Sequence, residues 1–158
     1  MEMHGPGKLK ITRRKLPHWQ LEGSTYFVTF SLADGVLSKE ERELVLQHLK
    51  NGDPKFYKLW AVTVMPDHVH ILIKPKEGIN LSRIMKGIKG VSARMLNQSR
   101  GSKGRVWQNE SMDRIIRDED EFNQKLNYMY MNSVNKELVA DPGRWDGWFL
   151  NLEGSDVD

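Results

Sequence analysis

The sequence predicts an α+β domain in which helices pack on an antiparallel β-sheet. Segments rich in β-branched and aromatic residues alternate with segments whose apolar residues recur at helical spacing. The expected order is strand, helix, strand, strand, helix, strand pair, helix, and only a tight turn separates the second strand from the third. A link that short joins antiparallel neighbours, because parallel strands need a longer crossover. This order therefore favours helices packed on an antiparallel sheet.

The chain has 158 residues, no cysteine, 39% hydrophobic residues and 28% charged residues. These values are typical of one globular domain, which we expect to comprise a basic arm at 1–20, the domain at 21–150 and an acidic tail at 151–158. No apolar run approaches 18 residues, and the polar, basic N-terminus has no apolar signal region. We therefore expect a cytoplasmic protein without a membrane partner.

The first half of the domain contains two expected strands and one expected helix. Residues 26–32 and 56–65 are rich in β-branched and aromatic residues and predict strands. Between them, Ser38 is expected to cap a helix, with Glu41 completing a capping box. Asn51-Gly52 is expected to end this helix.

A histidine-containing strand and a long helix follow. The turn Pro66-Asp67 leads into an expected strand that ends near Lys74, and a helix is expected over 81–97. Gly87 and Gly90 each cost this helix about 1 kcal/mol relative to alanine. Their positions suit either close approach of a backbone or phosphate, or close packing on the sheet.

The last part of the domain is expected to contain two short strands and a third helix. The strands are expected at 106–108 and 112–116, around a turn. The helix is expected over 119–135, with Asp118 as N-cap and Glu121 as its capping-box partner. Acidic residues in the first turn suit the positive end of the helix dipole.

His68 and His70 are separated by one residue on the expected third strand. Side chains at i and i+2 share a face, so the two imidazoles are expected side by side, with Val69 on the opposite face. Two such imidazoles form half of a metal site, although satisfied core or surface histidines remain an alternative. Asp67 could complete a zinc hydrolase site, but it is a poor third ligand because it would point to the opposite face.

The third helix has an apolar stripe with a polar pair beside it. Tyr128 and Asn132 are four residues apart and therefore adjacent, about 100° around the helix from that stripe. Asn132 could supply a third metal ligand, and Tyr128 could face whatever the metal binds. Tyr128 could also be an ordinary interfacial aromatic, whereas Tyr130 lies nearer the stripe and is assigned to the core. The stripe consists of Phe122, Leu126, Met129 and Ser133.

Basic residues are concentrated in two parts of the chain. The first 20 residues contain five lysines and arginines against one acid, and no acid occurs between Gly78 and Asn109. This segregation suits either a polyanion-binding surface or a solvated face. Trp107 could stack on a nucleobase or belong to the core.

The histidine pair with Tyr128 and Asn132 resembles the single-tyrosine HUH transposases, and most closely their REP-associated tyrosine transposase branch. The segments 17–19, 26–30, 64–70, 81–90, 106–111 and 113–117 also match, and the resemblance extends over about 13–148. It implies a ferredoxin-like or RNA-recognition-motif-like core. Two departures follow the tyrosine: Ser133 replaces a usual proline and Glu137 a usual glycine, which affects the end of the helix.

The resemblance implies a metal-dependent single-stranded DNA endonuclease and strand transferase that cleaves REP-type hairpins through a 5′-phosphotyrosine. Tyr128 would be the nucleophile, and His68, His70 and Asn132 would bind Mg²⁺ or Mn²⁺. The protein could act as a monomer or as a homodimer with shared sites. A non-catalytic hairpin-binding module is the alternative. The expected DNA contacts are Arg13, Arg14, Lys15, Arg83, Lys86, Lys89, Arg94, Arg100, Lys103, Arg105 and Trp107.

Overall fold

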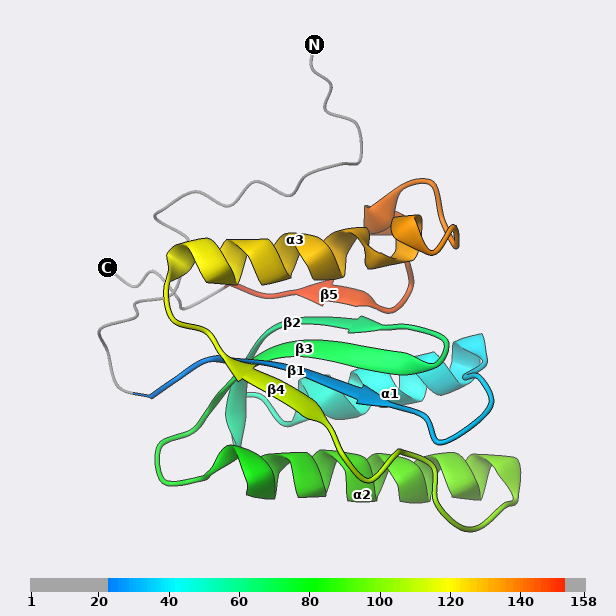
Figure 1. The fold of residues 1–158 in the computed structure, drawn as a ribbon. Helices are drawn as coiled ribbons and strands as arrows, with labels where there is room; N and C mark the ends of the chain where they lie inside the picture. Colours follow the sequence, from blue (N-terminus) through cyan, green and yellow to red (C-terminus); the bar gives the residue numbers. More distant parts are fainter. Residues whose placement is uncertain (1–22, 153–158) are drawn as a thin grey trace.

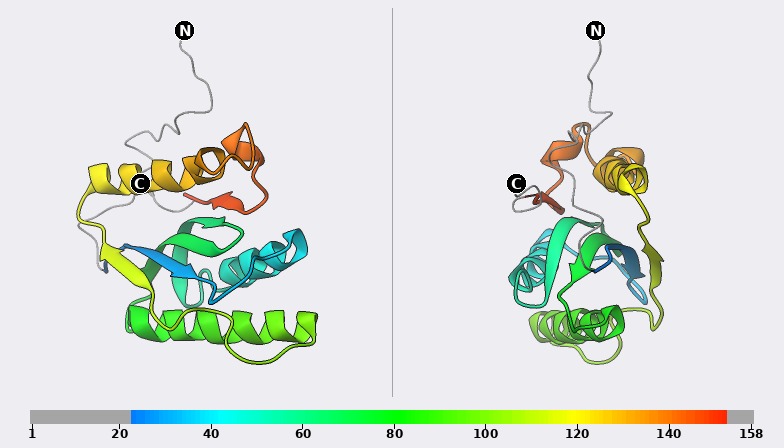
Figure 2. Two further views of the ribbon diagram at one scale, coloured as in Figure 1. Left: turned by 45° about the vertical axis from the view of Figure 1, so that its right-hand side comes forward. Right: turned by 90° about the vertical axis from the view of Figure 1, so that its left-hand side faces the viewer.

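The computed structural model describes residues 23–152 and places one five-stranded antiparallel sheet between helices on both faces. Helix α3 covers one face, and α1 and α2 cover the other (Figures 1 and 2). This confirms the predicted α+β class. The elements are β1 (Tyr26–Ser31), α1 (Lys39–Asn51), β2 (Tyr57–Val64), β3 (His68–Pro75), α2 (Leu81–Arg100), β4 (Met112–Ile115), α3 (Glu119–Asn135), the 3₁₀ turn η2 (Pro142–Arg144) and β5 (Trp148–Leu150).

The strand order is β4-β1-β3-β2-β5, so the histidine strand β3 lies at the centre of the sheet. All pairings are antiparallel, and Thr29 on β1 lies opposite His70 on β3. Both faces of the central strands are covered by helices, which explains why β2 and β3 are almost continuously apolar and buried. The strand with the histidines is therefore held firmly on both sides.

The face covered by α1 and α2 contains the larger apolar core. Val69, Ile71 and Ile73 point into it from β3, as the strand alternation predicts. Helix α1 begins with the predicted capping box between Ser38 and Glu41. Apolar side chains of α2 pack against this face, and the β3 side chains that point into its core are all apolar.

The opposite face contains a smaller core beneath α3. Phe122, Leu126 and Met129 are fully buried there against Leu72 and Trp60. The apolar stripe predicted for this helix is therefore confirmed. It fixes the rotation of α3 on the sheet and thereby sets where the residues beside the stripe lie.

The start of α3 differs from a simple capping box. Asp118 accepts a hydrogen bond from the Glu121 backbone N–H, as predicted. The Glu121 carboxylate, however, accepts from the Arg117 backbone N–H and also pairs with the Arg114 guanidinium on β4. These partners hold the pKa of Glu121 below its usual range, with the Arg117 N–H contributing most. Glu121 therefore ties α3 to the edge strand.

Three expectations about the segment between α2 and α3 need correction. Helix α2 continues to Arg100, three residues beyond the expected end, and is closed by Gly101 in the left-handed region. Residues 106–108 do not form a strand, because only an isolated bridge joins Trp107 to Leu32. Strand β4 pairs with β1 instead of forming a hairpin with that segment.

The C-terminal end of α3 shows why glycine is the usual residue at position 137 in the family that this sequence resembles. Glu137 has φ of 61°, a conformation that glycine adopts without strain. Its N–H bonds to the Val134 carbonyl, and the next N–H, of Leu138, reaches back to Ser133. These two bonds form a Schellman ending, in which glycine is the usual residue at the position of Glu137.

Candidate functional site

His68 and His70 lie side by side on the α3 face of the sheet, as predicted. Their ring centroids are 4.7 Å apart and the rings are nearly perpendicular, at 75°. His70 is buried, whereas the side chain of His68 is 18% exposed. The pair therefore has one deep member and one that solvent or a ligand can reach.

A hydrogen bond orients each imidazole through Nδ1. Thr29 Oγ1 lies 2.7 Å from His70 Nδ1, and Asp67 Oδ1 lies 2.7 Å from His68 Nδ1. This leaves Nε2 of each ring for another partner, and His70 Nε2 is buried without one. A histidine held at one nitrogen by an oxygen acceptor is the usual arrangement of a metal-binding imidazole.

The surroundings keep the His70 ring neutral. Burial lowers the pKa of His70 to about 3, and electrostatic repulsion from the nearby His68, Lys125 and Lys136 side chains acts in the same direction. A neutral imidazole presents a lone pair, which is the form that binds a metal ion. His70 is therefore suited to donate electrons at Nε2 across the neutral pH range.

Tyr128 lies against His70, as expected from its position beside the α3 stripe. The two ring centroids are 5.3 Å apart in an edge arrangement, and Tyr128 is 50% exposed. Phe27 on β1 completes the cluster by stacking on His70 and meeting Tyr128 edge-on at 6.3 Å. The phenol is thus fixed beside the histidines while half of its surface stays open to a substrate.

Asn132 is buried one helical turn beyond Tyr128, and its Oδ1 has no hydrogen-bond partner. A buried carbonyl oxygen without a partner carries a free-energy cost, so this atom is suited to an incoming donor or cation. Within residues 23–152, no three His, Cys, Asp or Glu side chains cluster as a metal site. The available donor set is two imidazoles and one carboxamide oxygen, while Asp67 is occupied in orienting His68.

The predicted basic residues of the second helix lie away from this site. Helix α2 covers the other face of the sheet, so its cations do not surround the histidines (Figure 2). Lys89 is held by Gln108 O, Asn109 O and Ser111 Oγ, and Arg100 pairs with Glu41. The other exposed cations of this region are Arg83, Lys86, Arg94, Lys103 and Arg105, whereas Arg13, Arg14 and Lys15 lie outside the described residues.

Trp107 requires a correction, because it is a core residue and not an exposed surface for base stacking. It is 4% exposed, its ring meets Phe30 edge-on at 4.8 Å, and its indole N–H donates to Ser92 Oγ. The indole ring and the indole N–H of Trp107 therefore both make contacts inside the protein. The core alternative describes it correctly.

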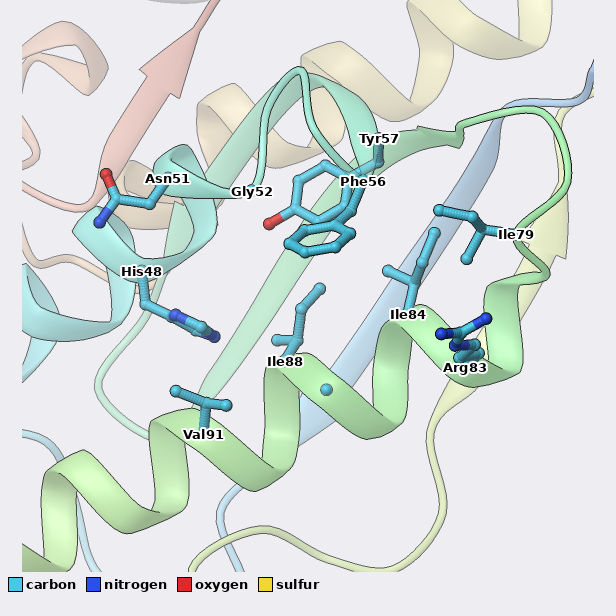
Figure 3. Close-up of a pocket in the computed structure, with 11 residues that line it drawn as sticks. His48, Asn51, Gly52, Phe56, Tyr57, Ile79, Arg83, Ile84, Ile88 and Val91 are labelled. Carbon is cyan, nitrogen blue, oxygen red and sulfur yellow. The ribbon is translucent and has the colours of Figure 1, made fainter.

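An apolar cavity of about 380 Å³ lies on the α1 and α2 side (Figure 3). His48, Phe56 and Ile88 line it, and His48 Nε2 is buried without a hydrogen-bond partner. A side chain at Gly87 or Gly90 would meet no atom within 4 Å, so close packing on the sheet does not explain these glycines. The cavity and the histidine pair lie on opposite faces of the sheet.

Three residues of the site were not identified from the sequence. Thr29 and Phe27 belong to it only because β1 pairs with β3, a long-range register that local patterns do not contain. Lys125 could have been identified, because it is three residues before Tyr128 and therefore shares its side of the helix. Its ammonium lies 5.1 Å from the centre of the Phe27 ring.

The fold and the site together define an α+β protein whose central strand presents paired histidines to a tyrosine on a helix. The family model described as "Transposase IS200 like" matches residues 33–114. The chain belongs to the IS200-like transposase family. The matched segment contains His68 and His70 but ends before Tyr128 and Asn132.

Individual relatives agree with this assignment. A Haemophilus influenzae protein assigned as a REP-associated tyrosine transposase is 23% identical over 137 residues, which cover 78% of each chain. The structure of a REP-associated tyrosine transposase bound to a REP hairpin superposes with a TM-score of 0.64 at 20% identity. That match covers 89% of this chain and 82% of the other.

A Deinococcus radiodurans crystal structure described as a transposase also matches. Its TM-score is 0.50 at 16% identity, with 84% of this chain and 99% of the other covered. These structural similarities support the fold. In the part of the chain that the structure describes, no helix is both long and apolar enough to cross a membrane.

Proposed function

We propose that the chain is a metal-dependent single-stranded DNA endonuclease and strand transferase that acts at REP-type hairpins. The observation that carries the proposal is the contact between Tyr128 and His70, whose Nε2 is buried without a hydrogen-bond partner. Membership of a transposase family and similarity to a protein bound to a REP hairpin support the choice of substrate.

The donor set fits a divalent cation. His70 Nε2 and Asn132 Oδ1 are buried without partners, and His68 is oriented by Asp67 with its Nε2 left over. Imidazole and carboxamide donors suit Mn²⁺, and Mg²⁺ is the alternative. When bound, the cation would act as a Lewis acid that withdraws charge from a phosphoryl oxygen.

The chain's own residues would supply the nucleophile and its orientation. The Tyr128 oxygen would attack the scissile phosphorus, forming a tyrosyl–phosphate bond as the bond to the 3′-oxygen breaks. The phenol proton would pass to solvent, and the departing 3′-oxygen would take up a proton. Because one phosphodiester replaces another, attack by a different 3′-hydroxyl could reverse the step and join strands.

We further propose that one chain completes this site by itself. Tyr128 already contacts the His70 ring of its own chain, and Phe27 holds both rings. Mixing Tyr128→Phe with His70→Ala protein is then expected to leave the mixture inactive. Restored cleavage in the mixture would show that a helix from a partner supplies the tyrosine.

An adduct assay tests the main proposal. The protein is incubated with Mn²⁺ and labelled single-stranded hairpins from its own genome, and denaturation-resistant complexes are separated on a gel. We expect an adduct that Tyr128→Phe abolishes while hairpin binding is retained. Tyr130→Phe is the matched control, because Tyr130 packs against Trp148 and does not contact the histidines.

Two outcomes would contradict the proposal. If Tyr128→Phe forms as much adduct as the natural chain, Tyr128 is not the nucleophile. If the natural chain binds a hairpin with high affinity but forms no adduct with Mn²⁺ or Mg²⁺, the chain is a non-catalytic hairpin-binding module.

A further inference from the structure

Tyr128 belongs to a line of polar side chains along α3. Glu121, Lys125, Tyr128 and Asn132 follow one another at spacings of four, three and four residues, so they lie on one side of the helix. Glu121 is neutralised by Arg114 at the sheet edge. Lys125 is thus the cation nearest to Tyr128 along this line.

Phe27 contacts Lys125 as well as the rings of His70 and Tyr128. The Lys125 ammonium lies 5.1 Å from the centre of the Phe27 ring, and that ring stacks on His70 at 5.3 Å and meets Tyr128 at 6.3 Å. The ammonium, the phenol and the buried imidazole therefore surround one aromatic side chain. The charge of Lys125 is also among those that lower the pKa of His70.

The charge balance of this region favours an anionic ligand. Burial keeps His70 neutral, Asn132 carries no charge, and Lys125 has no ion-pair partner among the described side chains. A cation beside neutral donors gains energy when a negatively charged group binds between them. A phosphodiester carries one negative charge, and more negative charge develops on its oxygens during displacement.

We propose that Lys125 is a catalytic residue that donates a hydrogen bond to a non-bridging oxygen of the scissile phosphate. The inference rests on the function proposed above and adds a residue to that site. In this role Lys125 transfers no proton and forms no covalent bond. Its role is to stabilise the negative charge that builds up while the tyrosyl–phosphate bond forms.

Single-turnover cleavage at saturating hairpin and Mn²⁺ tests this role. We expect Lys125→Met to slow adduct formation by about a hundredfold to a thousandfold, as removal of one charge-stabilising donor does in other enzymes. Hairpin affinity should change by less than about threefold, because one phosphate contact among several is lost. Lys125→Arg keeps the charge and should recover most of the rate.

Lys50→Met is the matched control. Lys50 also places its ammonium over an aromatic ring, that of Phe149 at 4.5 Å, but it lies on α1 across the sheet. Removing it deletes one positive charge and one ring contact without touching the site. We expect its cleavage rate to equal that of the natural chain.

A methylphosphonate at the scissile position separates direct contact from a structural role. This substrate lacks the negative charge on the non-bridging group, so Lys125→Met should slow its cleavage far less than that of the phosphodiester. Equal slowing of both substrates would mean that Lys125 only supports Phe27 and would overturn the proposal. An unchanged phosphodiester rate in Lys125→Met, with a normal adduct in the natural chain, would overturn it as well. No adduct from the natural chain would overturn the proposed function and this inference together.

Discussion

The two faces of the central sheet are built in opposite ways. Beneath α1 and α2, the strand residues Val69, Ile71 and Ile73 are apolar and fully buried. Beneath α3, the same strand presents His68 and His70, and the buried His70 Nε2 on this strand has no hydrogen-bond partner. The first face provides stability, whereas the second gives up some stability to hold groups ready for a ligand.

The largest expected effect comes from a substitution in the apolar face. Leu49 on α1 is fully buried, and Leu49→Ala is expected to lower the free energy of unfolding by about 2–5 kcal/mol. The loss combines the transfer energy of the removed atoms with the cost of a cavity. Urea unfolding measures it, and a loss below about 1 kcal/mol would show that this face is loosely packed.

The polar face should respond to substitution in the opposite direction. Asn132 is buried with an unpartnered Oδ1, so Asn132→Leu without divalent cations is expected to raise the free energy of unfolding by about 1 kcal/mol. The same variant should lose affinity for Mn²⁺. Unfolding in the presence of a chelator gives the first quantity, and calorimetric Mn²⁺ titration gives the second. A destabilised variant would mean that Asn132 is needed for folding.

The apolar cavity predicts a pH effect on the α1 and α2 face. Burial lowers the pKa of His48, so the unfolded chain takes up a proton at a higher pH than the folded chain does. The contribution of the neutral His48 side chain to the free energy of unfolding is therefore complete above about pH 6.5. It is lost as the pH falls below that value. His48→Leu should flatten the decline in melting temperature between about pH 7 and pH 5. If His48→Leu shows the same decline in melting temperature, the pH dependence comes from other titratable groups.

The smallest expected effects compare the ends of the two long helices. Gly101 after α2 and Glu137 after α3 both have positive φ, at 66° and 61°. Glu137→Gly is expected to raise the free energy of unfolding by up to about 1 kcal/mol, and Gly101→Ala should lower it by a similar amount. Thermal unfolding of both variants tests this. Destabilisation by Glu137→Gly would show that the glutamate side chain makes a compensating contact.

Local patterns were sufficient to predict most of the fold. The capping box of α1, the bounds of α3 and its apolar stripe all follow from neighbouring residues, and the structure confirms them. Strand pairing is different, because the contact of β4 with β1 joins segments far apart in the chain. For the same reason, the sequence predicted that the second helix is basic but not which face of the sheet it covers.

The candidate site could be predicted in part. His68, His70, Tyr128 and Asn132 follow from strand and helix spacing together with the family resemblance. The supporting residues depend on tertiary structure, since Thr29 reaches His70 only through the register of β1 and β3. The burial of Trp107 could not be predicted, because an aromatic residue in a basic segment has the same sequence pattern whether it is buried or exposed.

Locating the covalent bond tests the central claim most directly. After cleavage of a hairpin in the presence of Mn²⁺, the adduct is digested with protease and nuclease, and tandem mass spectrometry locates the residual nucleotide. The account predicts that the nucleotide is attached to Tyr128, the phenol in contact with His70. Attachment to Tyr130 or to any other residue would contradict it.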